Sequence, residues 1–131
     1  MIAFDTSLLV RIAVGDDAKQ KAAALALLES DKVWIAKTVL LETEWVLRSR
    51  YAVAPDEIAE FFAYLVESEG IVVEDDPAVR RAIALFEAGA DFADALHLAS
   101  AGEMPLCTFD RNFCRAAVRG GDVENVRVVK A

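Results

Sequence analysis

Short apolar runs alternate with helical segments along the whole chain, and this alternation limits the possible folds more than any other feature. The apolar runs are typical of short buried strands, which we expect at residues 1–4, 33–36, 70–73, 105–109 and 126–129. Helices are expected between and beside them, at residues 8–13, 18–29, 38–50, 55–67, 77–88, 91–101 and 111–118. Because helical crossovers join parallel strands, this order predicts a mostly parallel sheet with helices on both faces.

The chain gives no sign of a boundary between domains. The sequence contains no repeats, no low-complexity tracts and no linker rich in Pro, Gly or Ser. A length of 131 residues suits one domain with a single hydrophobic core. We therefore expect one α/β domain over residues 1–131, a three-layer α/β/α arrangement with a mostly parallel central sheet of about five strands.

Composition excludes some classes of function. The net charge of -8 argues against nucleic-acid binding through a general basic surface. No apolar run approaches the ~20 residues of a membrane span, and no export signal is visible at the N-terminus. Cys107 and Cys114 are therefore expected to be reduced core residues of a cytoplasmic protein. The mean hydropathy of +0.32 is high, which suggests a surface for a partner chain or for self-association.

The segment from Asp91 to Ala101 is expected to form a helix that is apolar around most of its circumference. Two acidic residues, Asp91 and Asp94, lie three residues apart in its first turn and therefore on one face. Ionised carboxylates beside a buried helix are unfavourable unless they are capped, paired or bound to a metal ion. The alternative to a binding site is a helix cap at Asp91 with an acid at the third helical position.

Two further carboxylates follow predicted strands directly, Asp5 after the first strand and Asp110 after the fourth. Ligands of parallel α/β folds bind beyond the carboxyl ends of the strands, so these side chains are expected at one edge of the sheet. Each could instead be a helix cap. Glu42 is expected on an apolar stripe of helix 38–50 near the same edge, with pairing to Arg48 as its alternative role. Glu44 lies off that stripe and is expected in solvent.

Four or five acids at one edge of one sheet need a compensating cation, because like charges at close range repel. Oxygen ligands alone suit Mg²⁺ or Mn²⁺. Zinc is not indicated, because His97 is the only histidine and no His/Cys cluster exists. A magnesium ion held by a few carboxylates is typical of phosphodiester chemistry, in which it activates water and stabilises charge on the phosphate.

Four short segments resemble the motifs of PIN-domain ribonucleases, and among these the VapC-type toxins of bacterial toxin–antitoxin pairs. They are Ile2-Ala-Phe-Asp-Thr-Ser7, Leu40-Leu-Glu-Thr-Glu-Trp-Val-Leu-Arg48, Asp91-Phe-Ala-Asp-Ala-Leu-His-Leu-Ala99 and Thr108-Phe-Asp-Arg-Asn-Phe113. The resemblance covers nearly the whole chain in the family's order. It departs from the family at Ser7, where Asn is commoner.

The resemblance implies a PIN-like fold and a Mg²⁺- or Mn²⁺-dependent endoribonuclease that cleaves cellular RNA and restrains growth. It also assigns residues to the site. The four acidic positions of the family fall on Asp5, Glu42, Asp94 and Asp110, as metal ligands and catalytic residues. Supporting positions fall on Asp91, Thr6 and Thr108. The family's toxins usually form homodimers and bind a VapB-type antitoxin, and both partners are expected here besides the RNA substrate.

The substrate phosphate needs positive charge, and Arg11, Arg111 and Arg115 are candidates that could equally be ordinary solvated arginines. Aromatic residues of helices 38–50 and 55–67, Trp45 among them, could lie in the core or at a partner surface. Two other functions compete with the nuclease. One is a PIN fold that has lost activity and serves as a binding module. The other is a receiver-like Mg²⁺-binding signalling domain, which is disfavoured because the acids after strand 70–73 read as a helix start and Lys130 has no helix beyond it.

Overall fold

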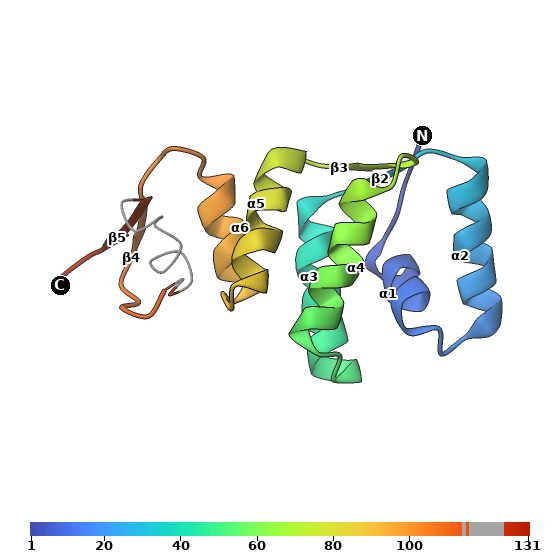
Figure 1. Ribbon diagram of the computed structural model, residues 1–131, viewed down its shortest axis with the longest axis horizontal. Coiled ribbons are helices and arrows are strands. Elements are labelled where there is room, and N and C mark those ends of the chain that lie inside the picture. Colours follow the sequence, from blue (N-terminus) through green and yellow to red (C-terminus); the bar gives the residue numbers. More distant parts are fainter. Residues whose placement is uncertain (114, 116–124) are drawn as a thin grey trace. The chain divides into compact units, whose positions relative to one another are not determined.

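The computed structural model describes residues 1–113, 115 and 125–131 (Figure 1). These residues form six helices and five strands. The chain divides into two compact units, residues 1–76 and residues 77–131, and each is described by itself below. No helix in the described part of the chain is long and apolar enough to cross a membrane.

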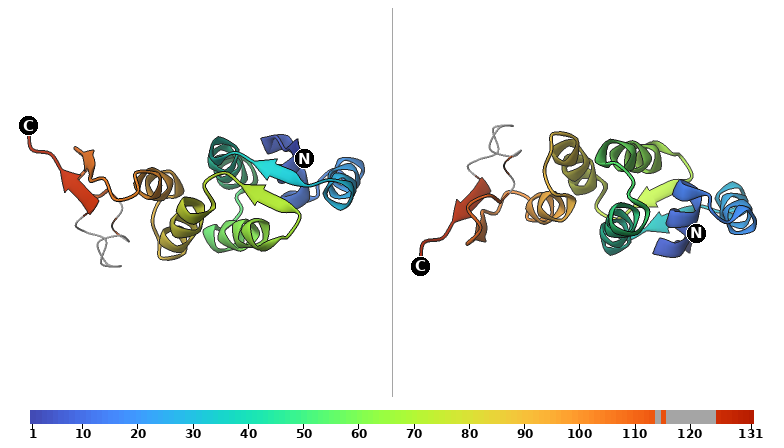
Figure 2. Two further views of the ribbon diagram at one scale, coloured as in Figure 1. Left: turned by 90° about the horizontal axis from the view of Figure 1, so that it is seen from above. Right: turned by 90° about the horizontal axis from the view of Figure 1, so that it is seen from below.

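The first unit contains a three-stranded parallel sheet in the order β1-β2-β3. Ile2 pairs with Val33, and Val33 pairs in turn with Ile71, so neighbouring strands run side by side in the same direction (Figure 2). The elements follow the chain as β1 (Ile2–Ala3), α1 (Thr6–Val14), α2 (Ala18–Ser30), β2 (Val33–Ile35), α3 (Lys37–Tyr51), α4 (Pro55–Glu67) and β3 (Ile71–Val73).

Local sequence signals set the ends of these helices. Asp5 caps the N-terminus of α1 through its side chain, and Gly15 ends the helix in the left-handed region at φ 70°. Asp17 caps α2 by accepting a hydrogen bond from the backbone of Gln20 at 3.0 Å. Helix α3 ends less favourably, because Ala52 takes the left-handed conformation at φ 52° without being glycine.

The core of the first unit lies between the sheet and its helices. Helix α1 packs against α2 and α3, while α4 packs against α3 and β3 (Figure 1). Burial of apolar side chains supplies the main stabilising free energy of such a core. Its fully buried members include Leu9, Val33, Ile35, Leu40, Leu47, Ile58, Phe62 and Leu65.

The second unit contains α5 (Asp76–Glu87), which begins at the last residue of the first unit, then α6 (Phe92–Ser100), β4 (Leu106–Thr108) and β5 (Val126–Val128). Helices α5 and α6 meet through an edge-to-face contact between Phe86 and Phe92, with ring centroids 5.3 Å apart. Strands β4 and β5 pair in parallel, with Cys107 opposite Arg127.

The predicted α/β fold with parallel strands is confirmed, and all five strands form within the segments where they were expected. They pair as a sheet of three and a sheet of two in the described residues, whereas one sheet of about five was predicted. The expectation of a core position for Cys107 is wrong: this side chain is exposed, because alternate residues of β4 face opposite sides. Cys114 and half of predicted helix 111–118 lie outside the described residues.

Candidate active site

The first unit brings three of the predicted site residues together. Asp5 accepts a hydrogen bond at Oδ1 from the backbone N–H of Thr6 at 2.8 Å. The hydroxyl of Thr6 donates to Oε1 of Glu42 at 2.5 Å, across 36 positions of sequence. Thr6 is only 7% exposed, while Asp5 and Glu42 are exposed. A buried hydroxyl therefore links the start of α1 to the Glu42 carboxylate of α3.

These residues line a cavity of about 340 Å³ that belongs wholly to the first unit. Its walls come from the first half of α1 and from α3. They carry both acidic and basic side chains, together with the indole of Trp45 and the phenol of Tyr51. A mixed cavity of this size is large enough for a small ligand or for one unit of a polymer. We call it the α1–α3 pocket, and its polar members are Asp5, Thr6, Ser7, Arg11, Glu42 and Arg50.

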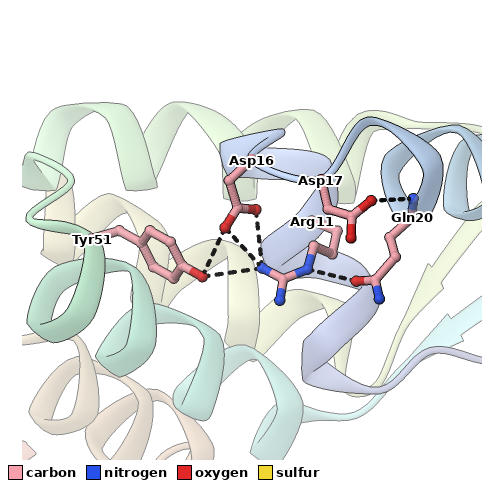
Figure 3. Close-up of polar contacts among 5 residues, drawn as sticks. All are labelled: Arg11, Asp16, Asp17, Gln20 and Tyr51. Atoms are coloured by element: carbon pink, nitrogen blue, oxygen red, sulfur yellow. Dashed lines mark hydrogen bonds and ion pairs between the residues drawn. The ribbon is translucent and has the colours of Figure 1, made fainter.

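Arg11 is held at the edge of the α1–α3 pocket by a network of polar contacts (Figure 3). Its Nη1 lies 3.0 Å from Oδ1 of Asp16 and donates to the hydroxyl of Tyr51 at 3.0 Å, while its Nε donates to Gln20 at 2.7 Å. The hydrogen bond with Tyr51 raises the pKa of Arg11, burial opposes this effect, and the charge of Asp16 adds to it. Arg11 thus already forms an ion pair with Asp16. The role of Arg11 as a phosphate contact stays a prediction.

The expectation that Glu44 lies in solvent is wrong. Glu44 is only 2% exposed and forms an ion pair with Arg48, whose Nε lies 2.7 Å from Oε2. The reason is the orientation of α3, which buries Leu40, Thr43, Glu44 and Leu47 with helical spacing. Glu44 therefore belongs to the buried stripe and takes Arg48 as its partner. Glu42 lies off that stripe, is exposed, and borders the α1–α3 pocket instead.

The second unit places Asp91 and Asp94 at the start of α6. Asp91 is the N-cap, and its Oδ2 accepts a hydrogen bond from the backbone N–H of Asp94 at 3.1 Å. The Asp94 side chain is half-buried. Burial raises the pKa of Asp94, the charges of Asp91 and Asp110 raise it further, and His97 lowers it. Asp91 and Asp110 are therefore both close enough to Asp94 to repel its charge.

Asp110 is positioned by the turn that follows β4. Its backbone N–H donates to the hydroxyl of Thr108 at 3.1 Å, and its Oδ1 accepts from the backbone N–H of Asn112 at 2.8 Å. Arg115 donates to the side-chain oxygen of Asn112, and both Arg111 and Arg115 are exposed. Thr108 thus supports the acidic site by fixing the backbone of Asp110.

The four predicted metal ligands divide between the units. Asp5 and Glu42 belong to the first unit, and Asp94 and Asp110 belong to the second. Within the described residues, no group of three or more His, Cys, Asp or Glu side chains is arranged to hold a metal ion. Because the grouping of all four acids involves both units, that grouping stays a prediction.

The sequence did not identify the aromatic residues and one of the arginines that line the α1–α3 pocket. Trp45 was expected in the core or at a partner surface, and Arg50 and Tyr51 were not considered as site residues. Trp45 could have been found from its spacing, because it follows Glu42 by three residues and so lies on the same face of α3. The contact of Tyr51 with Arg11, across 40 positions of sequence, gives no local signal.

Comparison with known proteins gives one family. The sequence profile of the PIN domain matches residues 2–119, a range that includes residues of both units. No curated protein and no solved structure was found to match the chain. PIN domains are generally nucleases, which agrees with the carboxylates gathered at the starts of α1 and α6. Since the match covers most of its length, the chain belongs to the PIN domain family.

Proposed function

We propose that this protein is a metal-dependent endoribonuclease that acts as the VapC-type toxin of a toxin–antitoxin pair. The observation that carries the proposal is the membership of the PIN domain family together with acidic residues at all four expected positions. The PIN domain match argues against the receiver-like alternative. Glu74 directly follows β3, and its side chain accepts a hydrogen bond from the backbone N–H of Lys37 at 2.9 Å. Glu74 therefore supports the start of α3.

The residues present fit a hard divalent cation. Every proposed ligand is a carboxylate, which is the donor type that Mg²⁺ and Mn²⁺ prefer. The pKa of Asp94 is raised by burial and by the neighbouring charges of Asp91 and Asp110, so the second unit carries negative charge that a cation would offset. When bound, the metal would supply charge stabilisation at the phosphate and a more acidic water. We propose Asp5, Glu42, Asp94 and Asp110 as its ligands.

The protein's own residues orient these ligands. The hydroxyl of Thr6 fixes one oxygen of Glu42, which leaves the other oxygen to accept a proton from the attacking water. The Asp91 cap holds the first turn of α6 and therefore the backbone that carries Asp94. Thr108 holds the backbone of Asp110 in the same way.

We further propose that residues 1–131 act as a single PIN domain, since one family profile runs across both units. A homodimer and a VapB-like antitoxin are proposed from the resemblance to VapC-type toxins. Exposed apolar side chains, such as Leu25 and Leu27 on α2, support such a partner surface.

The test is RNA cleavage by the purified protein with Mg²⁺, with Mn²⁺ and with EDTA. Asp94→Asn and Asp5→Asn should lower the rate at least about 100-fold, since even outer-shell partners of metal ligands are worth about 10- to 100-fold. The matched control is Glu60→Gln, which removes one exposed charge from α4 and should cleave at the wild-type rate. Cleavage by Asp94→Asn at the wild-type rate refutes the site. A wild-type protein that binds RNA but never cleaves it supports the inactive binding module.

A further inference from the structure

Trp45 presents an aromatic face beside the proposed catalytic carboxylates. It is 51% exposed, and it lines the α1–α3 pocket together with Asp5 and Glu42. Trp45 follows Glu42 by three positions, which places both on one face of α3. Because half of the indole surface stays in contact with water, only the other half contributes hydrophobic free energy to folding. A ligand that stacks on this face would remove that surface from water next to the acidic groups.

The α1–α3 pocket also contains two arginines in different situations. Arg11 is engaged by Asp16, Tyr51 and Gln20, as shown in Figure 3. Arg50 is exposed, and in the part of the chain that the structure describes it forms no ion pair. Its guanidinium carbon lies over the Trp45 ring, 6.0 Å from the ring centroid, in a cation–π contact. The charge of Arg50 is therefore held at the indole and is not paired with a carboxylate of the described residues.

We propose that the α1–α3 pocket binds one unpaired nucleotide of single-stranded RNA, with the base stacked on Trp45 and the adjoining phosphate at Arg50. The proposal rests on the proposed nuclease function for the identity of the polymer. Bases in a duplex are already stacked and paired, so only an unpaired base can lie flat on an aromatic side chain. The guanidinium beside the indole adds an anion contact where a phosphate follows the base.

This arrangement also explains how an acidic chain can hold RNA. With a net charge of -8, the protein has no excess of basic groups to bind phosphates along a broad surface. Stacking on an aromatic ring does not depend on net charge, and it accepts any base because every base has a π-face. Replacing Trp45 should therefore lower the affinity for RNA more than raising the salt concentration does. The weak salt dependence follows from the small number of phosphate contacts.

The experiment measures binding without cleavage. The probe is a single-stranded RNA of eight adenosines, titrated in Mg²⁺ into protein that carries Asp94→Asn. The added substitution Trp34→Phe leaves Trp45 as the only tryptophan, since the chain has two. Stacking of a base should quench its fluorescence as RNA binds. The two variants without Trp45 are measured through the fluorescence anisotropy of end-labelled RNA. Trp45→Ala should weaken binding by about 10- to 100-fold, and Trp45→Phe should retain most of it.

Two further variants sharpen the result. Tyr64→Ala is the matched control, because Tyr64 is also 51% exposed but lies on α4 outside the α1–α3 pocket, and it should bind within about twofold of the parent. Arg50→Met should reduce the slope of log affinity against log salt by about 0.7, the value for one contact to a single strand. A duplex of the same length should bind without quenching Trp45.

The outcomes separate this inference from the proposed function. RNA binding that leaves Trp45 fluorescence unchanged, or equal binding by the Trp45→Ala and parent proteins, overturns the inference. An equal loss in Tyr64→Ala overturns it as well, because the effect would then be nonspecific. If Trp45→Ala binds RNA normally while the wild type cleaves RNA, the nuclease stands and the stacking site does not. If Trp45 is quenched but the wild type never cleaves, the binding site stands and the nuclease does not.

Discussion

The ion pair between Glu44 and Arg48 on α3 makes an asymmetric prediction about stability. The Glu44 carboxylate is almost completely buried, while the Arg48 side chain is 47% exposed. Replacing Arg48 with Met leaves a buried negative charge without this partner. Replacing Glu44 with Met instead leaves a positive charge that water can reach. The first change should therefore cost much more free energy of unfolding than the second.

The magnitude follows from the burial of each group. Removing one partner of a fully buried pair costs about 3–5 kcal/mol, and partial exposure of Arg48 should reduce this to about 2–3 kcal/mol for Arg48→Met. Glu44→Met removes the desolvated charge itself and should change stability by no more than about 1 kcal/mol. In the double variant no buried charge remains. Adding Glu44→Met to Arg48→Met should therefore restore about 2 kcal/mol of the loss.

Urea unfolding followed by circular dichroism measures these differences. With slopes of about 1–3 kcal/mol per molar urea, Arg48→Met should lower the midpoint by roughly 1–2 M, and the double variant should recover most of it. The control is Arg50→Met, which removes an exposed arginine from the same helix and should stay within about 0.5 kcal/mol of the wild type. The reasoning is refuted if Glu44→Met destabilises the Arg48→Met protein further.

Two more predictions concern other sites. Burial, with the charges of Asp91 and Asp110, raises the pKa of Asp94, so its stabilising contribution is present at low pH and is lost as pH rises through the raised value. In EDTA at about pH 7, the free energy of unfolding of Asp94→Asn should therefore exceed that of the wild type by on the order of 0.5 kcal/mol in thermal melts. This difference in stability should shrink toward pH 3. A difference that grows in acid contradicts the prediction. Ala52→Gly should stabilise the protein by about 0.5 kcal/mol. The free energy gained by removing the steric strain of Ala52 in the left-handed region should exceed the entropic cost of ordering a more flexible glycine. Ala63→Gly, inside α4, should destabilise it by about 1 kcal/mol in the same thermal melts, and equal signs would refute the argument.

The secondary structure could be predicted because its signals are local. Asp5, Asp17 and Asp91 cap the helices that follow them, and the apolar runs are short enough to be strands. The boundaries were close for the same reason. The pairing of strands into a sheet of three and a sheet of two had no comparable signal, since apolar runs of similar composition can pair in several ways.

The buried face of α3 shows why the site was harder to predict. Two stripes of similar hydrophobicity run along this helix, one through Val39 and Val46 and the other through Leu40 and Leu47. Periodicity alone does not choose between them when each contains one glutamate. The structure buries the second stripe, and the buried Glu44 pairs with Arg48 on the next turn. The burial of Glu44 includes a side-chain contact that a hydrophobicity pattern does not describe.

Helix capping and ligand binding are not competing roles for the acids of this chain. Asp5 uses Oδ1 for the backbone of Thr6, and Asp110 uses Oδ1 for the backbone of Asn112. Each carboxylate has a second oxygen, so one atom can fix the side chain while the other faces a ligand. A capped carboxylate also has fewer rotamers to lose when it binds, which lowers the entropic cost of forming a site. The backbone hydrogen bonds that Asp5 and Asp110 accept therefore make both residues better suited to the proposed metal site.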